Sequence, residues 1–162
     1  MIKRTLKIVS LHLLLLYGLH IFAQESERTA ILATIQKFFD SIETRDRELL
    51  ESILVRDSLN ISVRTLANGD TNFNIMSYDD VVNALTRPGR DALERSWDET
   101  VLIRGNIAVV WTPYDFHIDG EFSHCGVDSF QLIKQEGRWL ISNSSWTLET
   151  EDCPESPLGP ID

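Results

Sequence analysis

Residues 93–150 hold four apolar-rich segments separated by very short turns, and this pattern constrains the fold more than any other feature of the chain. Gly105-Asn106 and Asp119-Gly120 suit two-residue hairpin turns, because both positions must tolerate positive φ. We therefore expect four antiparallel strands, at roughly 93–104, 107–118, 121–134 and 138–150. Tight turns also set which residues face each other, so the two faces of the sheet can be predicted by counting.

The chain before residue 93 predicts helices and two short strands. Residues 25–45 carry apolar side chains at helical spacing, and Asp46 can cap a second, shorter helix. Residues 59–66 and 72–76 have strand character, and Ser77 can cap a third helix. This order predicts an α+β fold in which a curved antiparallel sheet wraps around the long first helix.

The counted register predicts a pocket on one face of the sheet. From the Asp119-Gly120 turn, Asp115 faces His124 and Trp111 faces Asp128; a four-residue turn at 134–137 then sets Asp128 opposite Asn143. One end of this face is apolar. The other end carries polar and aromatic side chains: Asp98, Thr100, Trp111, Asp115, His117, His124, Asp128 and Asn143. An apolar floor that grades into a polar cluster is typical of a small-molecule pocket.

Pro113 makes part of this count conditional. Proline has no N–H to donate, so it indicates a bulge or an edge position in the second of the four strands. A bulge at Pro113 would turn Asp115 and His117 to the face opposite Trp111.

The opposite face of the sheet is predicted to be partly apolar as well. It carries Trp97, Val101, Ile103, Ala108, Val110, Val127, Leu140 and Trp146. A sheet that is apolar on both sides needs cover on both sides, and the helices can cover only one. We therefore expect a homodimer that packs through this outer face.

The pocket residues suggest acid–base chemistry or ligand binding. Asp128 in an apolar setting could have a raised pKa and act as a general acid or base; alternatively, it is a structural residue that hydrogen-bonds to Asn143. Asp115 and His124 could form a catalytic dyad, or only a salt bridge at the rim.

The ligand contacts are expected from both walls of the pocket. Trp111 is the candidate for stacking on a ligand, with Asn143, Asp98 and His117 as polar contacts. Phe38 and Phe39 would contribute from the first helix. His117, His124 and Asp115 lack the spacing of a metal site, so we predict no metal and no other cofactor.

The N-terminus resembles an export signal. Residues 1–23 combine a basic start, a short apolar run and Ala23 at a plausible cleavage point; an uncleaved anchor is the alternative. Export to a periplasmic or secreted location makes a Cys125–Cys153 disulfide reasonable, with two free thiols as the alternative. After cleavage we expect one domain at 24–150, a C-terminal tail at 151–162 and no membrane attachment. The net charge of −10 argues against nucleic acid as a partner.

The predicted order of elements resembles the nuclear transport factor 2-like, or SnoaL-like, superfamily, and residues 25–150 are similar to its exported bacterial members. The motif Gly137-Arg138-Trp139-Leu140-Ile141 and the ending Ser145-Trp146-Thr147-Leu148 carry the resemblance. It implies a cone-shaped sheet around the first helix and a small-molecule cavity.

The superfamily includes enzymes and non-catalytic proteins, so the resemblance leaves the activity open. The first reading is a binding domain with a partly apolar pocket. The alternatives are a lyase, isomerase or hydrolase that uses Asp128, and a non-catalytic dimeric interaction module. Its steroid-isomerase members use a pocket tyrosine; here Tyr78 and Tyr114 lie off the first helix, which argues against that chemistry.

Overall fold

The structure, a computed structural model, describes residues 24–66 and 68–161, and the predicted signal segment 1–23 lies outside them. The described residues form an α+β fold with three helices and one seven-stranded sheet. No helix in these ranges is long and apolar enough to cross a membrane.

The helices begin where the capping residues predict. The first helix covers residues 24–44, and α2 (Arg47–Ile53) starts after Asp46, whose carboxylate accepts a hydrogen bond from the Leu49 amide at 2.9 Å. In front of α3 (Tyr78–Leu85), Ser77 and Asp80 form a reciprocal capping box. Each cap satisfies amide groups that the first turn of a helix leaves without partners.

The seven strands form one sheet in the order β2-β1-β7-β6-β5-β3, and β4 also pairs with β5. Neighbouring strands are antiparallel except β1 and β7, which run parallel. Their bounds are β1 (Leu54–Thr65), β2 (Thr71–Met76), β3 (Ala92–Ser96), β4 (Thr100–Arg104), β5 (Ile107–Ile118), β6 (Glu121–Gln135) and β7 (Arg138–Thr147). The strand expected at 93–104 is thus two strands, separated at residues 97–99.

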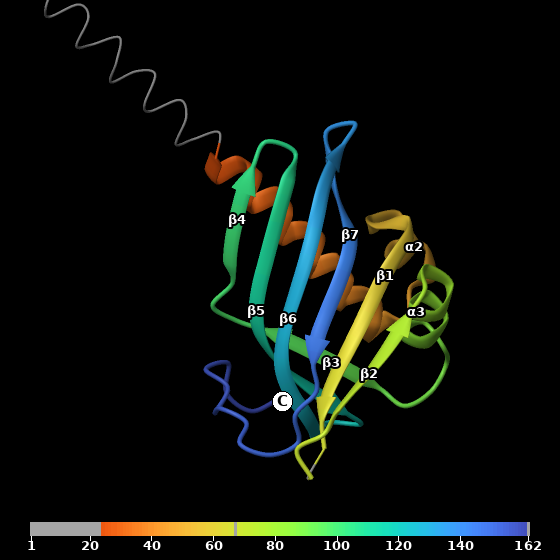
Figure 1. Cartoon of the computed structure of the whole chain (residues 1–162), viewed down its shortest axis with the longest axis vertical. Helices are drawn as coiled ribbons and strands as arrows, with labels where there is room; N and C mark the ends of the chain where they lie inside the picture. Colours follow the sequence, from red (N-terminus) through yellow and green to blue (C-terminus); the bar gives the residue numbers. More distant parts are fainter. Residues whose placement is uncertain (1–23, 67, 162) are drawn as a thin grey trace, which may run out of the picture.

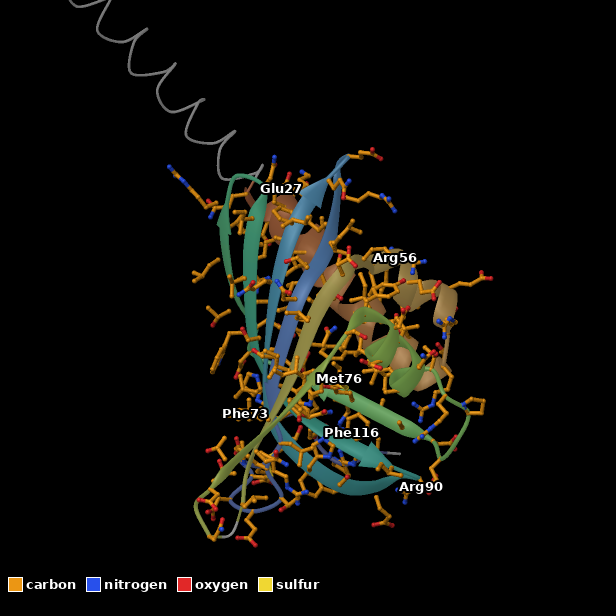
Figure 2. All side chains as sticks on the ribbon, turned by 45° about the vertical axis from the view of Figure 1, so that its right-hand side comes forward. Glu27, Arg56, Phe73, Met76, Arg90 and Phe116 are labelled. Atoms are coloured by element: carbon orange, nitrogen blue, oxygen red, sulfur yellow. A yellow bond between two sulfur atoms is a disulfide. The ribbon has the colours of Figure 1, made fainter. Side chains whose placement is uncertain are left out.

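The first helix runs diagonally across one face of the curved sheet, and α2 and α3 lie beyond β1 (Figure 1). The core is buried between this helix and the sheet, where Phe38, Phe39 and Phe130 meet edge to face at 5.2–6.1 Å. Toward β3 the sheet bends under the helices, in the region where Phe116 and Arg90 are labelled in Figure 2.

Our prediction of the β5–β6 register is correct for the first two facing pairs after the turn and wrong for all later pairs. Ile118 faces Glu121 and His117 faces Phe122, as counted, but Phe116 faces His124, so Ser123 is an extra residue in β6. Such a β-bulge shifts every later pair by one position. Because side chains alternate between the faces, Trp111, Asp115 and His117 lie on the outer face, opposite Asp128.

The β6–β7 pairing also differs from the count. A two-residue Glu136-Gly137 turn, with φ of 50° and 78°, replaces the expected four-residue turn. Ser142 is then an extra residue in β7, and Asn143 faces Gln131 rather than Asp128. Asn143 is therefore on the outer face too.

Pro113 does not cause a bulge. It pairs with Val127 in an unbroken part of the β5–β6 ladder, and its carbonyl accepts a hydrogen bond from the Trp97 amide at 3.3 Å. In a strand, the N–H and C=O groups of one residue point to the same side. An N–H group at Pro113 would therefore point to the break between β3 and β4. No strand is paired with β5 at that break, so its absence costs no hydrogen bond of the sheet.

Candidate functional site

A pocket opens between the first helix, α3 and the concave face of the sheet. Its inner space is about 70 Å³, within a depression of about 410 Å³ that includes its open mouth. The lining is mostly apolar and aromatic: Phe38, Ile42, Leu85, Glu94, Tyr114, Phe116, His124, Asp128, Phe130, Ser144 and Trp146. A cavity of about 150 Å³ holds benzene, so even a benzene-sized ligand would lie partly in the mouth.

Asp128 and Glu94 form a carboxyl pair in this pocket. Asp128 is only 4% exposed, and its Oδ2 has no hydrogen-bond partner. Burial raises the pKa of Asp128 to about 7, although the neighbouring Glu94 carboxyl acts in the opposite direction. Burial and the nearby Asp128 carboxylate raise the pKa of Glu94 well above its usual value. At neutral pH the pair therefore retains at least one proton, as expected for two carboxyl groups in one apolar site.

Most of the other polar groups of the pocket already form hydrogen bonds within the protein. The Tyr114 hydroxyl donates to the Thr147 carbonyl at 2.7 Å, and burial raises the Tyr114 pKa, so it stays neutral. The Ser144 hydroxyl donates to the Asn60 side chain at 2.7 Å. Two carboxyl groups and one imidazole, that of His124, thus remain to meet a ligand.

His124 lies at the pocket without a carboxylate partner. Its ring stacks on Phe116 at 4.8 Å between centroids, and its Nδ1 is 3.1 Å from the Ser123 hydroxyl oxygen. Burial lowers the His124 pKa, and the positive charge of Arg64 lowers it further. The imidazole is therefore neutral at pH 7. The predicted Asp115–His124 dyad is wrong, because the bulge at Ser123 pairs His124 with Phe116.

Asp115 and His117 belong to a different cluster, on the outer face. Arg95 donates two hydrogen bonds to Asp115, at 2.9 and 2.6 Å, and the His117 Nε2 lies 3.2 Å from Asp115. Burial alone would raise the pKa of Asp115, but hydrogen bonds from Arg95 and Ser156 outweigh it and the pKa is lowered. The cluster is a buried structural ion pair, outside the pocket.

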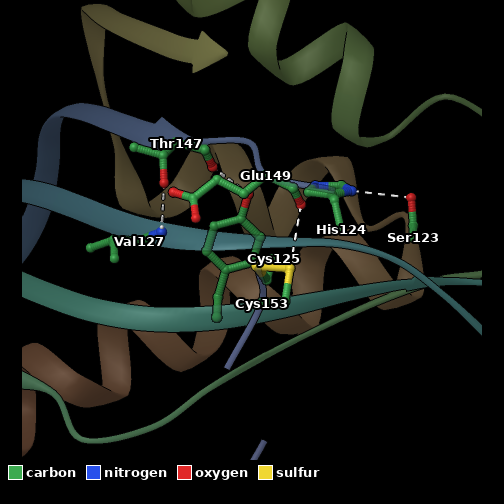
Figure 3. Close-up of a disulfide and its surroundings, with 8 residues drawn as sticks. Ser123, His124, Cys125, Val127, Thr147, Glu149 and Cys153 are labelled. Carbon is green, nitrogen blue, oxygen red and sulfur yellow. Dashed lines mark hydrogen bonds between the residues drawn. A yellow bond between two sulfur atoms is a disulfide. The ribbon is translucent and has the colours of Figure 1, made fainter. Parts of the chain in front are cut away.

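The C-terminal tail covers this cluster and is tied to the sheet by a disulfide. Cys125 and Cys153 are bonded, with Cα atoms 5.9 Å apart, as the sequence predicts. Glu149 exchanges two backbone hydrogen bonds with Cys125, both 2.9 Å (Figure 3). Farther along, the Gly159 carbonyl accepts a hydrogen bond from Arg95 at 2.9 Å.

The remaining predicted ligand contacts do not meet in the pocket. Trp111 is 53% exposed on the outer face, and Asn143 lies on the same face. Asp98 is exposed in the turn between β3 and β4, with a φ of 51°. Phe38 lines the pocket, but Phe39 does not, because its side chain is buried in the core beside Phe38.

Sequence reasoning missed Glu94. Its strand was expected as part of one long segment, 93–104, and an acidic residue there gave no signal of burial. Only the pairing of Glu94 with Phe116, which places β3 beside β5, brings this carboxyl to Asp128. In the part of the chain that the structure describes, no group of three or more potential ligands could hold a metal ion.

Solved structures with the same fold come from several bacteria. An NTF2-like protein from Cytophaga hutchinsonii is 19% identical, with a TM-score of 0.61, over 75% of this chain and 97% of that one. A protein of unknown function from Mycobacterium tuberculosis is 15% identical (TM-score 0.65; 85% and 81% covered). An NTF2-like protein with a cystatin-like fold from Novosphingobium aromaticivorans is 12% identical (TM-score 0.64; 82% and 88% covered). These likenesses concern the fold alone.

No curated protein matches this sequence. A family profile described as "Putative lumazine-binding" matches residues 26–147, which include every strand of the sheet. This family lies within the nuclear transport factor 2-like (SnoaL-like) group, to which the fold also corresponds. By its sequence match and its fold, the chain belongs to this family, described as "Putative lumazine-binding", of nuclear transport factor 2-like proteins.

Proposed function

We propose that the protein binds a small, mostly apolar molecule in the pocket between the first helix and the sheet. The observation that carries the proposal is the unpartnered Oδ2 of Asp128, which is buried among aromatic side chains. A buried polar atom without a partner costs free energy, and a ligand donor would remove that cost. The family description supports a flat heterocycle such as lumazine as the first compound to test.

The test is a titration of the mature chain with lumazine and a panel of small aromatic compounds, followed by NMR of ¹⁵N-labelled tryptophan indoles. Trp146 lines the pocket and Trp111 lies on the opposite face, so the chain contains its own control. Binding in the pocket should shift the Trp146 signal and leave the Trp111 signal in place. A panel that shifts neither signal at millimolar concentration would overturn the proposal.

A second candidate function is acid–base catalysis by Asp128, as a lyase, isomerase or hydrolase. The specific observation is its pKa of about 7, which suits proton transfer near neutral pH. Asp128→Asn should abolish turnover of any substrate found among the bound compounds while retaining binding. Unchanged turnover in this variant would exclude the role.

We further propose that the protein forms a homodimer through the outer face of the sheet. Exposed apolar side chains lie at both ends of that face: Leu59, Phe73 and Ile75 on β1 and β2, and Leu102, Ile107 and Trp111 on β4 and β5. Phe73 lies on the side away from the helices (Figure 2). Of the outer-face residues we predicted, Ala108 and Val110 are instead buried in the core, Val101 and Ile103 pack against it, and Trp146 lines the pocket.

Light scattering after size-exclusion chromatography tests the dimer. Trp111→Lys should convert a dimer into a monomer, whereas a wild-type protein that is monomeric at micromolar concentration would contradict the proposed dimer.

Export is likewise a proposal, supported by the N-terminal segment and by the disulfide. Expression of the full chain in a bacterium, with fractionation and N-terminal sequencing, tests for cleavage after Ala23.

A further inference from the structure

The polar groups of the pocket are mainly hydrogen-bond acceptors, apart from the proton that the Asp128–Glu94 pair retains and the one N–H of the His124 ring. Asp128 and Glu94 contribute four carboxyl oxygens, while Tyr114 and Ser144 already donate their hydroxyl protons within the protein. No lysine or arginine occurs among the described residues that line the pocket. A ligand carboxylate or phosphate would thus find no cationic partner and would face two carboxyl groups.

The walls of the pocket add to this preference. Phe38, Phe116, Phe130 and Trp146 present aromatic rings around the carboxyl pair. Aromatic faces attract organic cations through the ring quadrupole, and a buried carboxylate needs a charged or donor-rich partner. We infer that the natural ligand of this pocket is an organic cation, an amidine or alkylamine that also carries an aromatic group and whose N–H groups meet Asp128 and Glu94. This inference rests on the proposed binding function and specifies its ligand class.

The charge of the pocket depends on few groups. Glu94 on β3 and His124 on β6 are the titratable neighbours of Asp128 in the lining, apart from Tyr114 on β5. The first helix, α3 and β7 contribute no ionisable side chain to the lining, and Arg64 of β1 acts on His124. Since Tyr114 and His124 are neutral at pH 7, ionisation of the coupled Asp128–Glu94 pair determines the charge of the pocket near neutral pH.

Three compounds of nearly equal shape separate charge from fit: benzamidine (cationic), benzamide (neutral) and benzoate (anionic). Each is titrated into the mature protein, and the Trp146 indole signal reports binding in the pocket. We expect benzamidine to bind at least tenfold more tightly than benzamide and benzoate not to bind. The affinity for benzamidine should rise between pH 5.5 and 8.5, as Asp128 ionises, while that for benzamide stays constant.

Two variants assign the preference to the pocket. Asp128→Asn should remove the preference for benzamidine over benzamide. Asp91→Asn removes an equal charge at an exposed position and should retain the preference, which excludes an effect of the overall negative charge. Should Asp128→Asn not fold, the pH dependence of the wild-type protein decides the question by itself.

The outcomes separate this inference from the proposed function. If benzamide or benzoate shifts the Trp146 signal at the same concentration as benzamidine, the pocket binds ligands and the inferred charge class is wrong. If benzamidine affinity does not change with pH, the inference is also wrong. If none of the three shifts this signal at millimolar concentration, the inference is overturned, and the binding function is overturned as well only if lumazine and the rest of the aromatic panel also leave the signal in place.

Discussion

Replacing Asp128 with asparagine should stabilise the protein, and the gain should grow as the pH rises. Burial raises the pKa of Asp128 from 3.8 to about 7. Between these two values the folded protein holds a proton that the unfolded chain releases. Folding stability attributable to this group is therefore lost as pH rises from about 4 to above 7.

The size of the effect follows from the pKa change. Each pKa unit corresponds to about 1.4 kcal/mol, so the full rise amounts to about 4 kcal/mol as an upper bound. Asparagine has the same shape as protonated aspartate and can hydrogen-bond to Glu94, but it does not ionise. We expect the two proteins to differ little at pH 4 and the variant to be more stable by a few kcal/mol at pH 8.

Urea denaturation followed by circular dichroism, at pH 4 to 8 and with the disulfide oxidised, measures this difference. Asp91→Asn is the matched control, because the same chemical change at an exposed position should give a difference that does not vary with pH. A stability difference for Asp128→Asn that is independent of pH would refute the reasoning, since it would mean that the Asp128 carboxyl ionises with an ordinary pKa.

Three further variants test how the fold is held together. The double change of Cys125 and Cys153 to serine opens a link across 28 positions and should cost about 3 kcal/mol, measured by urea denaturation. Ser77→Ala removes the capping box of α3 and should cost about 1 kcal/mol in the same assay. Gly126→Ala would place a Cβ 2.2 Å from the Thr147 carbonyl oxygen, so the melting temperature should fall, in line with a loss of about 1–3 kcal/mol or more.

Each of these has its own control. Wild-type protein treated with reductant should match the double cysteine variant, and equal stability of the oxidised and reduced proteins would contradict a structural role for the bond. Ser77→Asp retains a capping side chain and should restore most of the loss. An unchanged melting temperature in Gly126→Ala would show that β6 and β7 are farther apart at this point than the structure indicates.

Local sequence signals were sufficient for the three helices and most of the strands, but not for the break at residues 97–99 or for the start of β1 at Leu54. Capping residues such as Asp46 and Ser77 act within one helical turn, and Gly105-Asn106 and Asp119-Gly120 form the turns that they predict. The α+β fold could also be inferred from the order of elements, and the superfamily from that order together with the motifs at 137–141 and 145–148. Part of the site was predictable for the same reason: Phe38 lies on the apolar stripe of the first helix and lines the pocket.

The composition of the pocket depended on tertiary structure. Side chains alternate along a strand, so the single extra residue Ser123 separated Trp111 from Asp128 and broke the expected pairing of Asp115 with His124. The sequence does not reveal this bulge, because the residue types around Ser123 do not differ from those of a regular strand.

The sequence by itself determined where strands and helices form, because caps and turns depend on interactions between near neighbours. Only the tertiary structure decided which carboxyl groups share the pocket. Glu94 and Asp128 are on strands that do not pair with each other, and they meet because β5 lies between β3 and β6 in a strongly curved sheet. Burial in that shared apolar space gives this pair its raised pKa values and the pocket its predicted preference for cations.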